Sequence, residues 1–198
     1  MKVYVQQYCA LGRQYLLIKS IYMMAENAAH NRRSIDEKQT TGGARMIAII
    51  DYDAGNIKSV EKALHYLGEE TVVSRDPQVL LSADKVILPG VGSFGDAMNN
   101  LNKFGLVPVI RELTEKGTPF LGICLGLQLL FESSDETPGV EGLGILKGKI
   151  VKIPPAPGLK IPHMGWNSLH LQNDGLLFKG IPEETYVYFV HSYYLQAK

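Results

Sequence analysis

A short cysteine segment flanked by glycines constrains this chain more than any other feature. Residues 118–132 read TPFLGICLGLQLLFE: an apolar run, a Gly-x-Cys-x-Gly core, and a second apolar run with helical spacing. This order predicts a strand, a sharp turn and a helix, with the thiol of Cys124 at the point of the turn; with serine, the same arrangement is the nucleophile elbow of hydrolases. We expect a Cβ at Gly122 or Gly126 to clash, because so tight a turn brings the flanking backbone close together.

Two interpretations of Cys124 compete. Free cysteine is among the most buried residue types and usually behaves as a small hydrophobic side chain. The glycines on both sides and the strand-to-helix junction favour the other interpretation, a nucleophile. At the start of a helix, unpaired N–H groups also stabilise a thiolate, which is the reactive form of cysteine.

The composition is that of an ordinary globular protein. The chain has 198 residues, 45% of them apolar and 20% charged, and its formal net charge is zero, so nothing global indicates nucleic-acid binding. Its two cysteines, Cys9 and Cys124, lie far apart in sequence, which favours a reducing compartment, and we expect a cytoplasmic protein. No uncharged apolar run reaches about 18 residues, the length that a membrane span needs.

The first 45 residues differ from the rest of the chain. They carry seven basic and three acidic side chains, a net charge of +4, whereas residues 46–198 carry a net charge of −4. We expect residues 1–45 to be an extension, disordered or partly helical, that ends in a linker, and residues 46–198 to be the domain. The extension is either a targeting segment or upstream sequence added by an early start codon. The second is favoured because Met46 directly opens a strand.

From Met46 onward, strands alternate with helices. Strands are expected at 46–50, 71–73, 85–88 and just before Cys124, and helices at 57–67, 77–81, 96–101 and 106–116. This rhythm predicts an α/β fold with a doubly wound, mainly parallel sheet. Such sheets bind ligands outside the carboxyl ends of their strands, where the loop 89–92 and Cys124 both lie. Later strands, at 149–153, around 168–171 and within 186–194, predict a smaller antiparallel sheet.

A cysteine nucleophile needs donors for an oxyanion and a base. One candidate donor is the backbone N–H of Leu125, and another lies in the glycine loop 90–92 (GVG). The same glycine-rich pattern is also typical of an ordinary strand-to-helix turn. Of the five histidines, His163 and His191 lie beside aromatic-rich loops and are the better candidates for a base. Hydrogen-bonded structural roles are nevertheless favoured for both. No cluster has the spacing of metal ligands, so we expect neither a metal nor a cofactor.

Five separated motifs resemble one known family. The segment Gly122–Gln128 (GICLGLQ) is similar to the nucleophile motif of class-I, triad-type glutamine amidotransferases. The other motifs resemble the glutaminase subunits of imidazole glycerol phosphate synthases, which act in histidine biosynthesis. They are IDYDAGN at 50–56, PGVGSFGDAM at 89–98, PHMGWN at 162–167 and FVHSY at 189–193. The resemblance covers none of residues 1–45.

The resemblance implies an activity and a set of site residues. Such subunits hydrolyse L-glutamine to glutamate and ammonia through a thioester on the cysteine, here Cys124. The ammonia passes to a (β/α)₈-barrel cyclase subunit in a heterodimer, which makes imidazole glycerol phosphate and an aminoimidazole carboxamide ribotide. By match, the oxyanion is stabilised by Gly92 and Leu125, the substrate is bound by Gly90, Gln128, Ser192 and Tyr193, and the partner is faced by Asn56, Trp166 and Tyr188. No cofactor, nucleic acid or membrane is implied.

The sequence departs from this family in one respect. The family's general base is a histidine in a later Phe-His-Pro-Glu stretch, whose glutamate completes the triad, and the sequence ends at Lys198 before such a stretch. His191 corresponds to a different position. We therefore expect the domain to lack the family's C-terminal elements and to show negligible glutamine turnover, since general acid–base help is worth about 10²–10⁴-fold. Two alternatives remain: a catalytically impaired docking module for the cyclase, and an unrelated α/β cysteine hydrolase.

Overall fold

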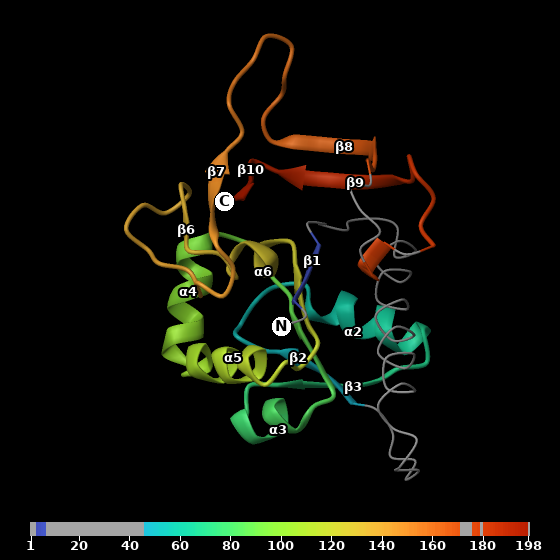
Figure 1. Ribbon diagram of the computed structural model, residues 1–198, viewed down its shortest axis with the longest axis vertical. Coiled ribbons are helices and arrows are strands. Elements are labelled where there is room, and N and C mark those ends of the chain that lie inside the picture. The colour runs from blue at the N-terminus through green and yellow to red at the C-terminus, as the bar shows by residue number, and fades with distance from the viewer. Residues whose placement is uncertain (1–2, 7–45, 171–175, 179, 198) are drawn as a thin grey trace.

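The computed structural model describes residues 3–6, 46–170, 176–178 and 180–197 (Figure 1). In chain order its elements are β1 (Val3–Gln6), β2 (Met46–Ile50), α2 (Ile57–Tyr66), β3 (Glu70–Ser74), α3 (Pro77–Ser82), β4 (Lys85–Leu88), α4 (Phe94–Lys103), α5 (Leu106–Glu115), β5 (Phe120–Ile123), α6 (Leu125–Gln128), β6 (Ser133–Ser134), β7 (Gly148–Lys152), β8 (His163–Ser168), η1 (Leu176–Phe178), β9 (Tyr186–His191) and β10 (Tyr193–Ala197). The elements expected between Met46 and Cys124 are all present.

The main sheet has five strands in the order β1-β5-β4-β2-β3, and every neighbouring pair is parallel. Parallel neighbours cannot be joined by a hairpin and need crossover connections, so β2, β3 and β4 are each followed by a helix. The doubly wound, mainly parallel α/β sheet predicted from the sequence is therefore confirmed.

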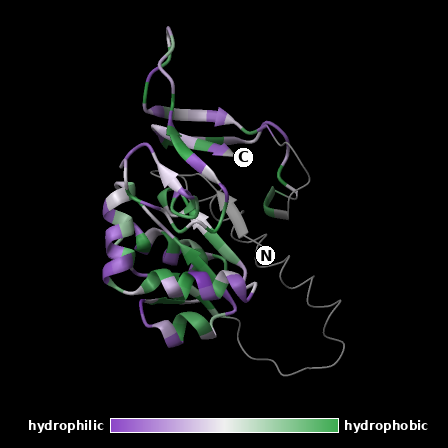
Figure 2. Ribbon diagram, turned by 60° about the vertical axis from the view of Figure 1, so that its left-hand side comes forward, coloured by the Kyte–Doolittle hydropathy of each residue, from purple (hydrophilic) through white to green (hydrophobic). Residues whose placement is uncertain are grey.

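Helices cover both faces of this sheet. Along β2, Ile47 and Ile49 pack into one apolar cluster with Val60 of α2. The alternate residues Ala48 and Ile50 belong to a second cluster, which also contains side chains of α3, α4 and α5. Successive side chains of a strand point to opposite faces, so the continuous apolar run of β2 reflects burial on both sides. Figure 2 shows the hydrophobic strands behind helices whose outward surfaces are hydrophilic.

Two smaller sheets are formed by the chain after Glu132. In the order β10-β7-β6, strand β7 pairs antiparallel with β10 and parallel with the short β6. Strands β8 and β9 pair antiparallel as a separate two-stranded ribbon at one end of the molecule (Figure 1). The predicted smaller antiparallel sheet is thus present, divided into two parts.

One strand boundary was predicted wrongly in this region. The strand expected around 168–171 is β8, which begins at His163 and ends at Ser168. The β-prone run 186–194 forms parts of two strands, because the chain changes partner at Ser192: β9 pairs with β8, whereas β10 pairs with β7. The Ser192 carbonyl accepts a hydrogen bond from the N–H of Ile153 at 2.9 Å, which fixes this crossing point.

Four residues of the expected N-terminal extension belong to the main sheet. Strand β1, Val3–Gln6, pairs parallel with β5, so that Val3 is opposite Phe120. The other residues of 1–45 lie outside the part of the chain that the structure describes, and the domain boundary at Met46 stays a prediction. None of the described helices combines the length and the hydropathy that crossing a membrane requires.

Candidate active site

The turn between β5 and α6 holds Cys124 in an unusual backbone conformation. Its φ is 54° and its ψ is −114°, a combination that residues with a Cβ rarely adopt. Such a conformation costs on the order of 1–3 kcal/mol and is found mainly where a site requires it. The side chain is half-buried. This strained position at the end of a strand favours the nucleophile interpretation of Cys124 over the structural one.

The two glycines beside Cys124 leave no room for side chains. A Cβ on Gly122 would lie 2.7 Å from the Cα of Leu127 and 2.8 Å from the carbonyl oxygen of Gly126. A Cβ on Gly126 would overlap the carbonyl oxygen of Leu88, the last residue of β4. The atoms struck belong to the backbone and cannot rotate aside. The clash predicted from the sequence is therefore confirmed.

The helix after Cys124 is shorter than its apolar pattern predicted. Helix α6 spans only Leu125–Gln128. Beyond it, the carbonyls of Leu129 and Phe131 accept hydrogen bonds from the backbone N–H groups of Leu143 and Gly144, at 2.8 and 3.2 Å. These tertiary bonds replace the i to i+4 bonds that a longer helix would need. The apolar run is buried by the fold rather than extended as a helix.

A pocket of about 250 Å³ opens beside Cys124. It is lined by Val91, Gly92, Cys124, Leu125, Gln128, Glu136, Pro162, Val190, His191, Ser192 and Tyr193. The structure therefore brings together six residues that were predicted for the site and that come from three separate segments: Gly92, Cys124, Leu125, Gln128, Ser192 and Tyr193. As the first residue of α6, Leu125 carries a backbone N–H with no partner within the helix.

Gly90, which was also expected to bind substrate, is not among the lining residues. It is buried, and a Cβ there would lie 2.6 Å from the hydroxyl oxygen of Tyr52 and 2.7 Å from the backbone nitrogen of Gly126. The glycine loop therefore presents Val91 and Gly92 to the pocket and packs Gly90 against the elbow. The φ of Gly92 is 103°, which glycine adopts without strain.

The side-chain amide of Gln128 is a polar group prepared for a ligand. Gln128 is only 7% exposed yet lines the pocket, and its side chain has no hydrogen-bond partner among the described residues. A buried polar group without a partner is unusual in a native protein and costs free energy until something pairs with it. A ligand with complementary polar groups would satisfy this amide.

Glu136 was not among the site residues predicted from the sequence. It is the one carboxylate among the described residues that line the pocket, and its Oε2 accepts a hydrogen bond from the N–H of Phe94 at 2.8 Å, at the start of α4. Its neighbour Asp135 is exposed and pairs instead with Lys149 at 2.6 Å. The local sequence does not indicate which of these two acids lines the pocket. The path of the turn after β6 decides this, and it places Glu136 there.

His191 also lines the pocket, and both of its ring nitrogens have structural partners. Its Nδ1 lies 2.9 Å from the carbonyl oxygen of Tyr193, and its Nε2 lies 3.3 Å from Nδ1 of His163. Burial lowers the pKa of His191, the Tyr193 carbonyl partly opposes this, and the charge of His163 lowers it further. The hydrogen-bonded roles favoured for both histidines agree with these contacts. No group of three or more potential metal ligands occurs within the described ranges.

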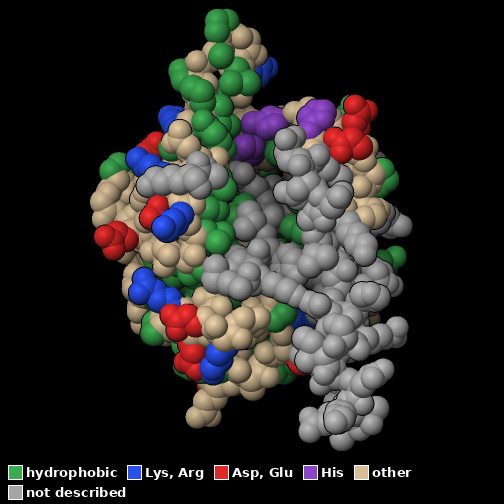
Figure 3. All heavy atoms as spheres, viewed as in Figure 1, with side chains coloured by type: hydrophobic (Ala, Val, Ile, Leu, Met, Phe, Trp, Pro, Cys, Tyr) green, Lys and Arg blue, Asp and Glu red, His purple; other side chains and the backbone are tan. Residues whose placement is uncertain are grey.

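The residues expected to face a partner lie outside the pocket. Trp166 of β8 and Tyr188 of β9 are opposite each other in register, and their rings meet edge to face with centroids 5.5 Å apart. Trp166 is 45% exposed, which is high for so large an apolar ring. Asn56 is exposed at the start of α2. Figure 3 shows that histidine side chains gather over the β8–β9 ribbon on one face of the molecule.

A parallel α/β sheet that presents a strained cysteine between two sterically required glycines defines a cysteine-dependent enzyme of the nucleophile-elbow class. Residues 48–198 match the sequence model of the family described as "Glutamine amidotransferase class-I". The chain belongs to this family.

Its relatives within the family carry a more specific name. The chain is 55% identical to "Imidazole glycerol phosphate synthase subunit HisH" of Moorella thermoacetica over 151 residues, which cover 76% of this chain and 71% of that protein. It is 56% identical to the protein of the same name from Aquifex aeolicus over 146 residues, 73% of this chain and 70% of that one. A solved "Crystal structure of glutamine amidotransferase" shares the fold, with a TM-score of 0.59, 18% identity and coverage of 79% and 76%.

Proposed function

We propose that this chain is the glutaminase subunit of an imidazole glycerol phosphate synthase, and that it supplies ammonia to a barrel cyclase partner in the cytoplasm. The observation that carries the proposal is the position of Cys124, strained at the elbow and facing a pocket with Leu125 and Gly92 beside it. The name of the family, glutamine amidotransferase, supports the choice of glutamine as substrate. The names of relatives about half identical to this chain support the choice of the synthase.

Each step of the proposed reaction uses Cys124 or the backbone N–H groups beside it. The thiolate sulfur of Cys124 attacks the carboxamide carbon of glutamine, forming a C–S bond and placing negative charge on the amide oxygen. The N–H of Leu125 and a backbone N–H at Gly92 stabilise that oxygen, and such preorganised donors are typically worth about 10²–10³-fold each. The C–N bond then breaks, and the nitrogen leaves as ammonia after taking up, by way of solvent, the proton that the thiol lost when it ionised. Water hydrolyses the γ-glutamyl thioester to glutamate and restores the thiol.

Substrate recognition follows from the groups that the pocket offers. The buried amide of Gln128 complements the polar groups of a bound glutamine. Glu136 provides the negative charge that the α-ammonium of an amino acid requires, and a charged pair of this kind is stronger than a neutral hydrogen bond. The backbone at Ser192 and Tyr193 borders the same pocket and offers further hydrogen bonds.

The partner is proposed to dock on the aromatic pair of exposed Trp166 and half-buried Tyr188. Their rings meet edge to face on the β8–β9 ribbon, and aromatic residues of this kind often carry most of an interface's binding energy. The same ribbon continues through His191 and Ser192 into the pocket wall. A cyclase bound to it would therefore sit next to the site where ammonia is released.

The test uses a chloroketone analogue of glutamine, in which the carboxamide is replaced by a chloromethyl ketone. Its alkylation of the thiol forms an S–C bond and releases chloride. We expect stoichiometric labelling at Cys124, located by mass spectrometry, that glutamine prevents and asparagine does not. A Cys124→Ala variant should not be labelled. Labelling that ignores glutamine would refute the proposal, and cyclase binding without any labelling would instead support the docking-module alternative.

A further inference from the structure

Tyr52 joins the first loop of the domain to the glycine loop beside the nucleophile. It follows β2, is 1% exposed, and donates a hydrogen bond from its hydroxyl to the carbonyl oxygen of Pro89 at 2.7 Å. Pro89 begins the loop that presents Val91 and Gly92 to the pocket. The two partners are 37 positions apart in sequence. The hydroxyl therefore fixes the orientation of the peptide group that leads into the candidate oxyanion loop.

The same hydroxyl is packed against the elbow itself. The space where a side chain of Gly90 would stand is closed by the Tyr52 hydroxyl, by the backbone nitrogen of Gly126 and by the Cβ of Leu125, at 2.6, 2.7 and 3.0 Å from an ideal Cβ. The phenol, the glycine loop and the first turn of α6 thus form one contact cluster. A shift of the phenol would move the glycine loop relative to Cys124.

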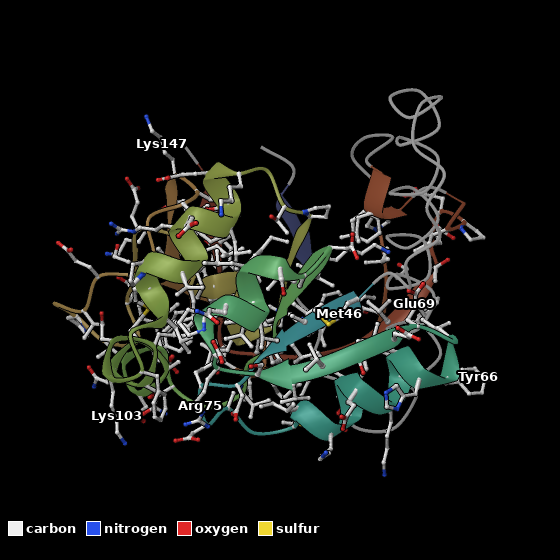
Figure 4. The ribbon with its side chains drawn as sticks, turned by 90° about the horizontal axis from the view of Figure 1, so that it is seen from below. Met46, Tyr66, Glu69, Arg75, Lys103 and Lys147 are labelled. Atoms are coloured by element: carbon white, nitrogen blue, oxygen red, sulfur yellow. The ribbon has the colours of Figure 1, made fainter. Side chains whose placement is uncertain are left out.

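The loop that carries Tyr52 is held from its other side. Arg75 lies 2.7 Å from a carboxylate oxygen of Asp51 and 2.7 Å from one of Asp53, the two residues that flank Tyr52. Its guanidinium also stacks over the ring of Phe104, 4.2 Å from the centroid. Figure 4 shows Arg75 at one end of β3, with Glu69 and Tyr66 at the other. The clamp restrains the backbone from which the phenol projects.

The phenol stays a hydrogen-bond donor at neutral pH. Burial raises the pKa of Tyr52 well above its ordinary value, and the negative charge of Cys124 raises it further. The Pro89 carbonyl can only accept a hydrogen bond, so the hydroxyl proton of Tyr52 points toward this carbonyl.

We propose that Tyr52 is a positioning residue for the oxyanion loop: its hydroxyl anchors Pro89 and thereby aligns the backbone N–H donors of loop 90–92 with Cys124. This inference rests on the proposed glutaminase chemistry. Tyr52 itself does not touch the substrate, since it is not among the residues that line the pocket. Its effect should therefore appear in the rate of attack and not in the affinity for substrate.

The test compares Tyr52→Phe with the unaltered full-length chain in alkylation by the glutamine chloroketone, with the rate measured against reagent concentration. The substitution removes one oxygen and keeps the ring. We expect the maximal alkylation rate to fall about 10-fold, less than the 10²–10³-fold that loss of a direct oxyanion donor costs. The concentration at half-maximal rate should change by less than about 2-fold, because ground-state binding is untouched. The matched control is Tyr66→Phe, an exposed tyrosine on α2, which should change neither quantity.

The outcomes separate this inference from the proposed function. If the unaltered chain is not labelled at Cys124, the proposed glutaminase chemistry fails. If it is labelled and Tyr52→Phe is labelled at the same maximal rate, only the positioning role of Tyr52 fails. A variant that loses rate and affinity by the same factor, or that no longer folds, would assign Tyr52 a merely structural role and overturn the inference.

Discussion

His163 and His191 face each other across the β8–β9 ribbon, with Nδ1 of His163 3.3 Å from Nε2 of His191. The Tyr193 carbonyl, 2.9 Å from Nδ1 of His191, can only accept, so this nitrogen carries the proton. Nε2 of His191 then accepts from His163, whose own Nε2 lies 2.7 Å from the amide nitrogen of Asn167. The hydrogen bonds run in one direction, from the exposed ribbon to the pocket wall, and they require Nε2 of His191 to carry no proton.

This arrangement predicts a pH dependence of stability. The pKa of His191 is lowered below its ordinary value of 6.5, chiefly by burial. The unfolded chain therefore binds this proton more readily than the folded one, and the free energy of unfolding should decrease as pH falls below about 6.5. Chemical denaturation between pH 5 and 8 measures this. A His191→Asn variant should show a smaller loss across that range, and an identical loss would contradict the assignment.

The second prediction concerns the glycine that supports the elbow. Gly126→Ala would force a Cβ into the carbonyl of Leu88, and overpacking against rigid backbone should destabilise the fold by roughly 3 kcal/mol. Gly68→Ala is the matched control: its φ is 77°, but the space around it is open. There only the left-handed conformation is penalised, by about 1 kcal/mol. Thermal or urea unfolding would show the difference, and equal losses would mean that the elbow relaxes.

The third prediction concerns Glu136. If its carboxylate binds the α-ammonium of glutamine, Glu136→Gln should raise the half-saturating concentration of the glutamine chloroketone roughly 10- to 100-fold, since hydrogen bonds to charged groups are worth about 1.5–3 kcal/mol. The maximal alkylation rate should change little. Asp135→Asn alters the neighbouring acid, which pairs with Lys149 outside the pocket, and should leave binding intact. Equal effects of both substitutions would point to general electrostatics.

The fourth prediction concerns docking. Trp166→Ala should weaken binding to the cyclase subunit by about 30-fold, the effect of losing about 2 kcal/mol at a central aromatic anchor. The fold should tolerate the change, because the ring is 45% exposed in the chain alone. Tyr66→Ala, at a tyrosine 72% exposed on α2, serves as the control. Isothermal titration with purified cyclase measures both, and an unaltered affinity of the Trp166 variant would remove this residue from the interface.

Local patterns predicted the part of the site that depends on local geometry. Cys124 and its two glycines could be interpreted from five consecutive residues, because a tight strand-to-helix turn has the same steric needs in any fold. The length of α6 could not be predicted. Its apolar continuation pairs with backbone near Leu143, and that competition between hydrogen bonds exists only once the chain has folded.

The sequence by itself determined the alternation of strands and helices, the elbow and the steric need for its glycines, because periodicity and backbone sterics act over a few residues. Only the tertiary structure decided which distant groups meet at Cys124. The strand order β5-β4-β2 brings the loops after these three strands to one edge, so Tyr52 reaches Pro89 and the glycine loop reaches the elbow. The turn after β6 places Glu136, and not Asp135, in the lining of the pocket. Which distant residues meet depends on how whole strands are placed, and no short stretch of sequence encodes that placement.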